Sequence, residues 1–328
     1  MILILSSTEI QRSVEDVIDW IEYLGGEYVR LNGADMMKSI PFSLSLSNSE
    51  TTTTLSEYDL NQVKTVWFRG FIRHRLYTKN IIDNLEASND SISELKLRTI
   101  YELRNITNAF FEDLSNKKQT PSLSSMKLSK YEVLKEAIKI GFAVPDSIIT
   151  NSKSEIMNFY HKHSKKIISK SLYETVYFED QDGMFFFKTE LLTEELLDST
   201  TDYFFPSLFQ QYIDKQFELR VFFLDDICYP MAIFSQLDNK TSTDFRNYNI
   251  NTPNRTVPYI LPTNIERKIK KLMKLLKLNT GSIDLIKDKK GDYIFLEVNP
   301  TGQFGMTSYP CNYHLEKLIA KFLIQNDK

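Results

Sequence analysis

Glycine is scarce in this sequence, with 10 among 328 residues, and no Gly-rich loop of the kind that cradles phosphates in P-loop enzymes is present. The two cysteines, Cys228 and Cys311, are too few for a disulfide framework or a zinc cluster. No apolar run approaches the roughly 20 residues of a membrane span, and no basic stretch precedes the short apolar run at residues 1–5. These absences predict a cytoplasmic protein with no membrane partner.

Neither sign of charge is in large excess, since 40 Lys and Arg face 43 Asp and Glu and the formal net charge is -3. A dedicated nucleic-acid binder would carry a strongly basic surface, so no nucleic-acid partner is expected. Hydrophobic residues make up 42% of the chain, which is typical of a globular protein. The length allows two or three lobes.

The first 120 residues predict a lobe that mixes helices and strands. Residues 1–5 are typical of a buried strand, and residues 14–26 of a helix that ends at two glycines. Residues 41–47 and 64–71 are expected to be strands on either side of a Ser/Thr-rich loop at residues 48–54. Residues 80–118 are expected to be largely helical.

The remainder predicts two further lobes, a central lobe over residues 121–209 and a C-terminal lobe over residues 210–328. A helix beginning at Lys130, a glycine stop and several strands are expected in the central lobe. The C-terminal lobe is expected to contain a hairpin at residues 217–236, a helix at residues 264–278, a second hairpin across DKKGD and a closing helix. The predicted fold class is α/β with α+β elements.

The stretch IFLEVNPTGQFG presents polar groups from a predicted strand. Glu297 and Asn299 are two residues apart and therefore share one face of it. If the hairpin turn is centred between Lys290 and Gly291, Asp284 lies opposite Glu297 and shares that face. Three hard oxygen donors without histidine or thiol favour magnesium. The alternative is the ordinary polar face of a half-exposed hairpin.

Cations earlier in the chain complement these oxygens. Lys170 and Arg220 stand within apolar strand sequences, IISKSL and FELRVFF, where an unpaired charge would be expensive. Lys130 begins a predicted helix, and Arg246 ends the segment TSTDFR. Together these side chains suit the charge of a triphosphate and of a phosphoryl group in transfer.

The order of these motifs resembles that of the ATP-grasp ligases. The series is SKYEVLKEAIKIGFAVPDS, IISKSL, FQQYI, ELR, DFR, GSIDLI and LEVNPTGQF. KQFELRVFF, DFR, LEVNPTGQF and the ending SYPCNYHLEKLIA are more narrowly similar to the peptide maturases of graspetide systems, the microviridin type and especially the grasp-with-spasm branch. The resemblance implies an ATP-grasp fold with an N-terminal pre-ATP-grasp lobe, nucleotide between two antiparallel sheets, ATP and Mg²⁺ as cofactors, and a homodimer.

The resemblance also implies roles for particular residues. Lys130 and Lys170 would contact nucleotide phosphates, Gln210, Gln211, Tyr212 and Ile213 would line the adenine pocket, and Asp284, Glu297 and Asn299 would hold magnesium. Arg220 and Arg246 would steady the transferred phosphoryl group, with Glu218 and Asp244 orienting them. Gln211 departs from related hinges, which often carry an acid at this position.

The implied activity is that of a peptide macrocyclase. It would activate Asp or Glu side chains of a ribosomal precursor peptide as acyl-phosphates and join them to Ser/Thr hydroxyls or Lys amines. Trp67, Arg69 and Arg73 in WFRGFIRHR form a candidate leader-binding cluster, although Trp67 could equally be a core residue. Gln303 is a candidate for substrate contact. Two alternatives remain, a ligase for free amino acids, small acids or a protein tail, and a non-catalytic nucleotide-binding regulator.

Overall fold

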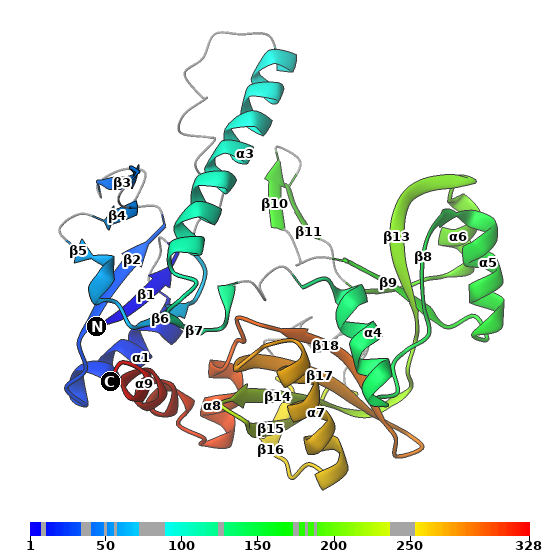
Figure 1. Cartoon of the computed structure of the whole chain (residues 1–328). Coiled ribbons are helices and arrows are strands. Elements are labelled where there is room, and N and C mark those ends of the chain that lie inside the picture. The colour runs from blue at the N-terminus through cyan, green and yellow to red at the C-terminus, as the bar shows by residue number, and fades with distance from the viewer. Residues whose placement is uncertain are drawn as a thin grey trace. The chain divides into compact units, whose positions relative to one another are not determined.

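The structure is a computed structural model that describes residues 1–7, 11–33, 41–48, 51–55, 58–71, 89–123, 128–172, 177–180, 183–186, 189–236 and 253–328. The chain divides into two compact units (Figure 1). The first combines Met1–Met126 with His314–Lys328, and the second is Lys127–Tyr313. None of the helices among the described residues is long and apolar enough to cross a bilayer.

The first unit is built on a parallel sheet with strand order β2-β1-β6-β7. Leu3 and Leu5 of β1 face a core that includes Phe110 and Leu114, from α3 and the residue that follows it. Helix α9, from the end of the chain, packs on α1. The elements of this unit are β1 (Ile2–Ser6), α1 (Arg12–Tyr23), β2 (Tyr28–Asn32), β3 (Phe42–Leu46), β4 (Thr51–Leu55), β5 (Tyr58–Asp59), β6 (Thr65–Phe68), α3 (Asn89–Asp113), β7 (Lys118–Thr120) and α9 (Leu315–Asn326).

One expectation for this unit is wrong. Residues 51–54 do not belong to a loop, because β4 pairs with β3 in an antiparallel hairpin whose register joins Leu44 to Thr53. Threonine is β-branched and favours strands, and this preference outweighs the polar composition that suggested a loop.

Among the described residues, the second unit contains two larger antiparallel sheets with strand orders β12-β9-β13-β8 and β16-β15-β14-β17-β18, and an antiparallel pair of strands, β10 and β11. Its elements are α4 (Lys130–Ile140), β8 (Ser147–Ser152), α5 (Lys153–Lys162), β9 (Ile167–Lys170), β10 (Tyr177–Asp180), β11 (Gly183–Phe186), β12 (Glu190–Leu191), α6 (Glu194–Ser199), β13 (Tyr203–Gln211), β14 (Lys215–Leu224), β15 (Ile227–Phe234), β16 (Arg255–Pro258), α7 (Thr263–Leu275), β17 (Thr280–Asp288), β18 (Tyr293–Asn299) and α8 (Gly305–Cys311).

The five-stranded sheet has one apolar face and one face on which charged and apolar side chains stand together. Leu219, Val221 and Ile283 point into a core formed with the apolar sides of α4 and α7, which meet each other. Side chains alternate along a strand, so Glu218 and Arg220 lie on the opposite face from this core. The sheet therefore presents its charged residues on the side that α4 and α7 leave open.

A β-bulge in β18 determines which of its residues reach that open side. On the turn side of the hairpin Leu285 pairs with Phe295, whereas further along Asp284 pairs with Glu297, so Leu296 is the extra residue. Phe295 belongs to the buried core, while both Leu296 and Glu297 line the open face. Without the bulge, Glu297 would share the face of Phe295 and point into the core.

Candidate active site

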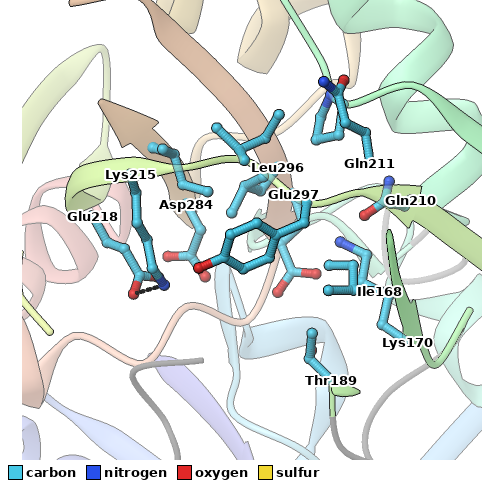
Figure 2. A pocket seen from close by; sticks show the side chains of 14 residues that line it. Ile168, Lys170, Thr189, Gln210, Gln211, Lys215, Glu218, Asp284, Leu296 and Glu297 are labelled. Carbon is cyan, nitrogen blue, oxygen red and sulfur yellow. Dashed lines mark hydrogen bonds and ion pairs between the residues drawn. The ribbon is translucent and has the colours of Figure 1, made fainter. Parts of the chain in front are cut away.

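A cleft lies between the four-stranded and the five-stranded sheet of the second unit (Figure 2). It is open to solvent along one side. The four-stranded sheet and the segment after it supply one wall, and the five-stranded sheet supplies the other. Its lining consists of Pro145, Ile168, Lys170, Thr189, Gln210, Gln211, Tyr212, Ile213, Lys215, Glu218, Asp284, Ile286, Leu296 and Glu297.

Three charged side chains form a row across adjacent strands. Arg220 on β14 pairs with Asp284 on β17, which pairs with Glu297 on β18. Arg220 Nε lies 3.8 Å from Asp284 Oδ1, and both side chains are largely buried. The row places a guanidinium beside two carboxylates at one end of the cleft, and the predicted pairing of Asp284 with Glu297 is confirmed.

Asn299 lies in the neighbouring row, opposite Ser282. Its Oδ1 accepts hydrogen bonds from Thr301 Oγ1 at 2.9 Å and from the Gly302 backbone N–H at 3.3 Å. Asn299 therefore closes the turn after β18, and its oxygen would have to exchange these partners to bind a metal ion. This residue does not line the cleft in the present structure.

Two lysines contribute positive charge from other elements. Lys130, the first residue of α4, lies 3.3 Å from Glu297 Oε2 through Nζ and donates a hydrogen bond to the Ser171 carbonyl at 2.9 Å. A capping box between Ser129 and Glu132 fixes the start of this helix. Lys170 projects from the end of β9 into the cleft. Both lysines can therefore reach an anionic ligand held beside Asp284 and Glu297.

The opposite end of the cleft is more apolar and contains the connection from β13 to β14. Gln210 is buried, and the Gln211 and Tyr212 backbone N–H groups donate to the Asp146 and Lys166 carbonyls. Burial raises the pKa of the Tyr212 hydroxyl above its ordinary value, with the nearby Asp214 charge adding to the effect. Ile168 and Leu296 supply apolar surface of the kind that packs on a planar ring.

Sequence reasoning missed Lys215, which lines the cleft and is almost completely buried. Its Nζ lies 2.6 Å from Glu218 Oε1, and the same carboxylate oxygen accepts a hydrogen bond from Ser235 Oγ at 2.8 Å. The sequence does contain a signal for this residue, because Lys215 stands just before the apolar stretch FELRVFF, where a buried charge needs a partner. Glu218 is thus held by Lys215 and Ser235.

The remaining candidates lie outside the described residues, in the turn after β18 or in the first unit. Arg246 and Asp244, and likewise Arg73, lie outside the described residues. Gln303 is exposed, and its carbonyl accepts a hydrogen bond from Ser282 Oγ at 3.3 Å. In the first unit Trp67 is buried in β6, and Arg69 stacks on its ring at 5.7 Å. Burial favours the core alternative for Trp67 and lowers the pKa of Arg69 to about 10.

The donor set agrees with magnesium bound together with a phosphate ligand. Within the described part of the chain, no group of three or more His, Cys, Asp and Glu side chains is placed to hold a metal ion by itself. Asp284 and Glu297 offer two carboxylates on the cleft, with the Asn299 carboxamide nearby. Magnesium is commonly bound by one or two carboxylates and completes its shell with substrate phosphates and water.

Comparison with known proteins assigns this arrangement to a family. Residues 126–323 match the RimK-like ATP-grasp domain. The chain is 28% identical to a RiPP-associated ATP-grasp ligase from Chryseobacterium gregarium, solved in complex with ADP and a leader and core peptide, with a TM-score of 0.85 over 99% of this chain and 96% of that one. No curated protein matches the sequence significantly.

Two further solved structures share the fold. Macrocyclase MdnC from Microcystis aeruginosa MRC, bound with precursor peptide MdnA, is 24% identical, with a TM-score of 0.82 over 99% of both chains. The ATP-grasp ligase PsnB, complexed with a minimal precursor, Mg and ADP, is 16% identical, with a TM-score of 0.78 over 100% of this chain and 97% of that one. The expected fold class and the predicted resemblance are confirmed.

Proposed function

Since the chain belongs to the RimK-like ATP-grasp family, we propose that it is an ATP- and magnesium-dependent ligase that matures a ribosomally made precursor peptide. One observation carries the proposal. The family match spans residues 126–323, whereas the similarity to the Chryseobacterium ligase covers 99% of this chain at 28% identity. The N-terminal unit is therefore part of the likeness to a ligase that binds a leader and a core peptide.

The proposed reaction activates an Asp or Glu side chain of the precursor as an acyl-phosphate. A Ser or Thr hydroxyl, or a Lys amine, of the same peptide then attacks the carbonyl carbon and expels phosphate. Each ester or amide crosslink removes one water from the peptide overall, and ADP and phosphate are the other products. Bound ATP supplies the phosphoryl group, and bound magnesium neutralises phosphate charge.

Residues in and beside the cleft have separate roles in this reaction. Lys130 and Lys170 would bind phosphate oxygens, while Asp284, Glu297 and Asn299 would hold the magnesium ion. Arg220 lies beside Asp284, where a fixed guanidinium can stabilise charge that develops during phosphoryl transfer. The segment from Gln210 to Ile213 would bind the base. Arg246 and Asp244 remain proposed contributors near the acyl-phosphate.

The substrate partner in this proposal is a precursor peptide with a leader segment. Arg69 and Arg73 are the proposed leader contacts on the N-terminal unit, and Gln303 is a proposed contact for the reacting segment. A cytoplasmic location and a homodimer belong to the same proposal. The two free thiols agree with a reducing compartment.

Intact mass spectrometry of the precursor tests the function. The candidate precursor is a short reading frame beside this gene that is rich in Thr or Ser and in Asp or Glu. Incubated with enzyme, ATP and magnesium, it should lose one water per ring. Glu297→Gln is the matched control, because it keeps the size of the side chain and removes a magnesium-binding charge, and it should leave the mass unchanged.

Other outcomes separate the competing functions. An unchanged precursor mass, with ADP released when free amino acids are added, would assign the chain to the small-molecule ligases. ATP binding without ADP release under any of these substrates would favour a non-catalytic regulator. Either result would overturn the peptide-maturase proposal.

A further inference from the structure

A short chain of hydrogen bonds ends at the base-binding part of the cleft. Ser147 Oγ lies 2.8 Å from the Pro145 carbonyl oxygen and 2.8 Å from Gln210 Nε2. Ser147 on β8 is paired directly with Gln210 on β13, so their side chains lie on the same face of the four-stranded sheet. Pro145 and Gln210 both line the cleft, whereas Ser147 does not.

The directions of these hydrogen bonds follow from the chemistry of the groups. A serine hydroxyl carries one proton, and a carbonyl oxygen can only accept. Ser147 must therefore donate its proton to Pro145, which leaves only lone pairs to face Gln210. The amide group that approaches Ser147 at 2.8 Å must then be the NH₂ group. The Ser147–Pro145 pair thus sets the orientation of the Gln210 amide.

This orientation leaves an acceptor for a ligand. Gln210 is 1% exposed, and its Oε1 has no hydrogen-bond partner among the residues that the structure describes. Figure 2 shows this oxygen on the side of the amide that faces the interior of the cleft. A buried acceptor without a donor is unfavourable, and a ligand N–H at this place would relieve that cost.

We propose that Ser147 is a positioning residue that determines nucleobase selectivity through Gln210. With the amide held in this orientation, the cleft offers an acceptor to the base. It therefore favours a purine with an exocyclic amino group at position 6 and disfavours one with a carbonyl oxygen there. This inference rests on the proposed function only in that the ligand is a purine nucleotide.

Binding of ADP and inosine diphosphate (IDP) to the full chain, measured by isothermal titration calorimetry, tests the inference without a peptide. The two ligands differ at purine position 6 and in the proton that N1 then carries. The wild type should prefer ADP. Ser147→Ala frees the amide to turn its NH₂ group toward the ligand, so the ratio of ADP to IDP affinity should fall by about tenfold, the worth of one hydrogen bond.

Ser147→Thr is the matched control, because it keeps the hydroxyl and suits a β-strand, and it should retain the wild-type ratio. If Ser147 had only a structural role, its replacement would lower the affinity for ADP and for IDP equally and leave their ratio unchanged. Ser147 is itself exposed, so a water molecule that takes the place of its hydroxyl in Ser147→Ala would also leave the ratio unchanged. In both cases Ser147 does not determine the selectivity, so an unchanged ratio in a folded Ser147→Ala variant overturns the inference.

The outcome is separable from that of the proposed function. If the wild type binds ADP selectively and Ser147→Ala loses the selectivity, the inference holds even when no precursor is cyclised. If the wild type binds ADP and IDP equally, the inference fails whatever happens to the peptide.

Discussion

The buried pair of Lys215 and Glu218 shows at the scale of single residues how the cleft holds charge. The two side chains are 2% and 8% exposed, and the separation between Nζ and Oε1 is 2.6 Å. Removing one partner of such a pair leaves a buried charge without its counter-ion, which is more damaging than removing both. The stability of this wall of the cleft should therefore depend on the pair as a unit.

Lys215→Met should lower the free energy of unfolding by about 3 kcal/mol, because Glu218 then keeps its charge without the lysine. The double variant Lys215→Met/Glu218→Gln should recover part of this loss, since the remaining group is neutral and Ser235 can still donate to it. Thermal unfolding midpoints of the three proteins measure the effect. A double variant less stable than Lys215→Met would contradict the argument.

The two thiols should be unreactive in the folded chain. Burial raises the pKa of Cys228 from 9.0 to about 12 and that of Cys311 from 9.0 to about 11. At pH 8 both are therefore protonated, and iodoacetamide should modify the denatured chain at two sites and the native chain at neither. The prediction would be refuted if intact mass showed that Cys228 is alkylated as fast in the native chain as in the denatured chain.

The same shifts have a consequence for stability at high pH. Above pH 9 the unfolded chain releases thiol protons that the folded chain keeps up to about pH 12 at Cys228. The stabilisation that these protonated thiols give to the folded chain is therefore fully present below pH 9, and it is lost as pH rises through their folded-state pKa values. Replacing both cysteines by valine should make unfolding less sensitive to pH between 9 and 11.

Residues of the site could be predicted from the sequence where a charge interrupts an apolar strand. That argument found Lys170 and Arg220, and it applies equally to Lys215, which was overlooked. It could not find Ser147, because a serine near the start of a strand is ordinary and its importance comes only from the amide that the fold places opposite it. The roles assigned to Asp284, Glu297 and Asn299 stay predictions. Asp284 and Glu297 line the cleft, whereas Asn299 does not.

At the scale of elements, the β17–β18 hairpin depends on a bulge and on the turn that follows it. The predicted pairing of Asp284 with Glu297 is correct, but the assumed turn centre is not, because Lys287 pairs with Tyr293. The bulge at Leu296 compensates for the difference of one residue. A bulge has no simple sequence signal, so this agreement could not have been argued in advance from the residues.

Gly302 should be the most sensitive glycine of this region. Its φ is +55°, and a Cβ there would lie 3.1 Å from the Gly281 backbone and 3.2 Å from the Phe222 ring. Gly302→Ala should therefore combine backbone strain with a clash, and it should disturb the turn that Asn299 caps. Loss of stability and a weaker response of the enzyme to magnesium are expected together.

Gly291→Ala is the matched control for this variant. Gly291 also has a positive φ, +92°, but a Cβ there would meet nothing within 4 Å. Strain alone should lower the free energy of unfolding by about 1 kcal/mol, and magnesium dependence should not change. Equal thermal destabilisation by the two substitutions would mean that the approach of Gly302 to β17 is unimportant.

At the scale of the whole molecule, the ATP-grasp fold was predictable from the order of several weak motifs. The expected lobes at residues 1–120, 121–209 and 210–328 stay a prediction, but the compact units show where such linear reasoning reaches its limit. His314–Lys328 groups with Met1–Met126, so the chain returns to its first unit at the end. Periodicity identifies the closing helix as amphipathic, but it does not say which element covers its apolar side.

The packing of α9 on α1 predicts which residues a core substitution in α9 should destabilise. Ile319 on α9 is 2% exposed, and the N-terminal amine of Met1 lies 2.7 Å from Asp327 Oδ1 just beyond this helix. Ile319→Ala should remove about 2–5 kcal/mol of packing free energy from the first unit. Hydrogen exchange should then increase in residues 12–32, although they are nearly 300 positions away in the sequence.

Ile269→Ala on α7 provides the matched comparison, because Ile269 is also a helical isoleucine and is 0% exposed. It belongs to the core beneath β14, β17 and β18, so exchange should increase in residues 280–299 and ADP affinity should fall. Ile319→Ala should leave ADP affinity unchanged, because the cleft residues all lie within Lys127–Tyr313. Faster exchange at residues 280–299 in Ile319→Ala would show that the two units do not behave as separate packing units.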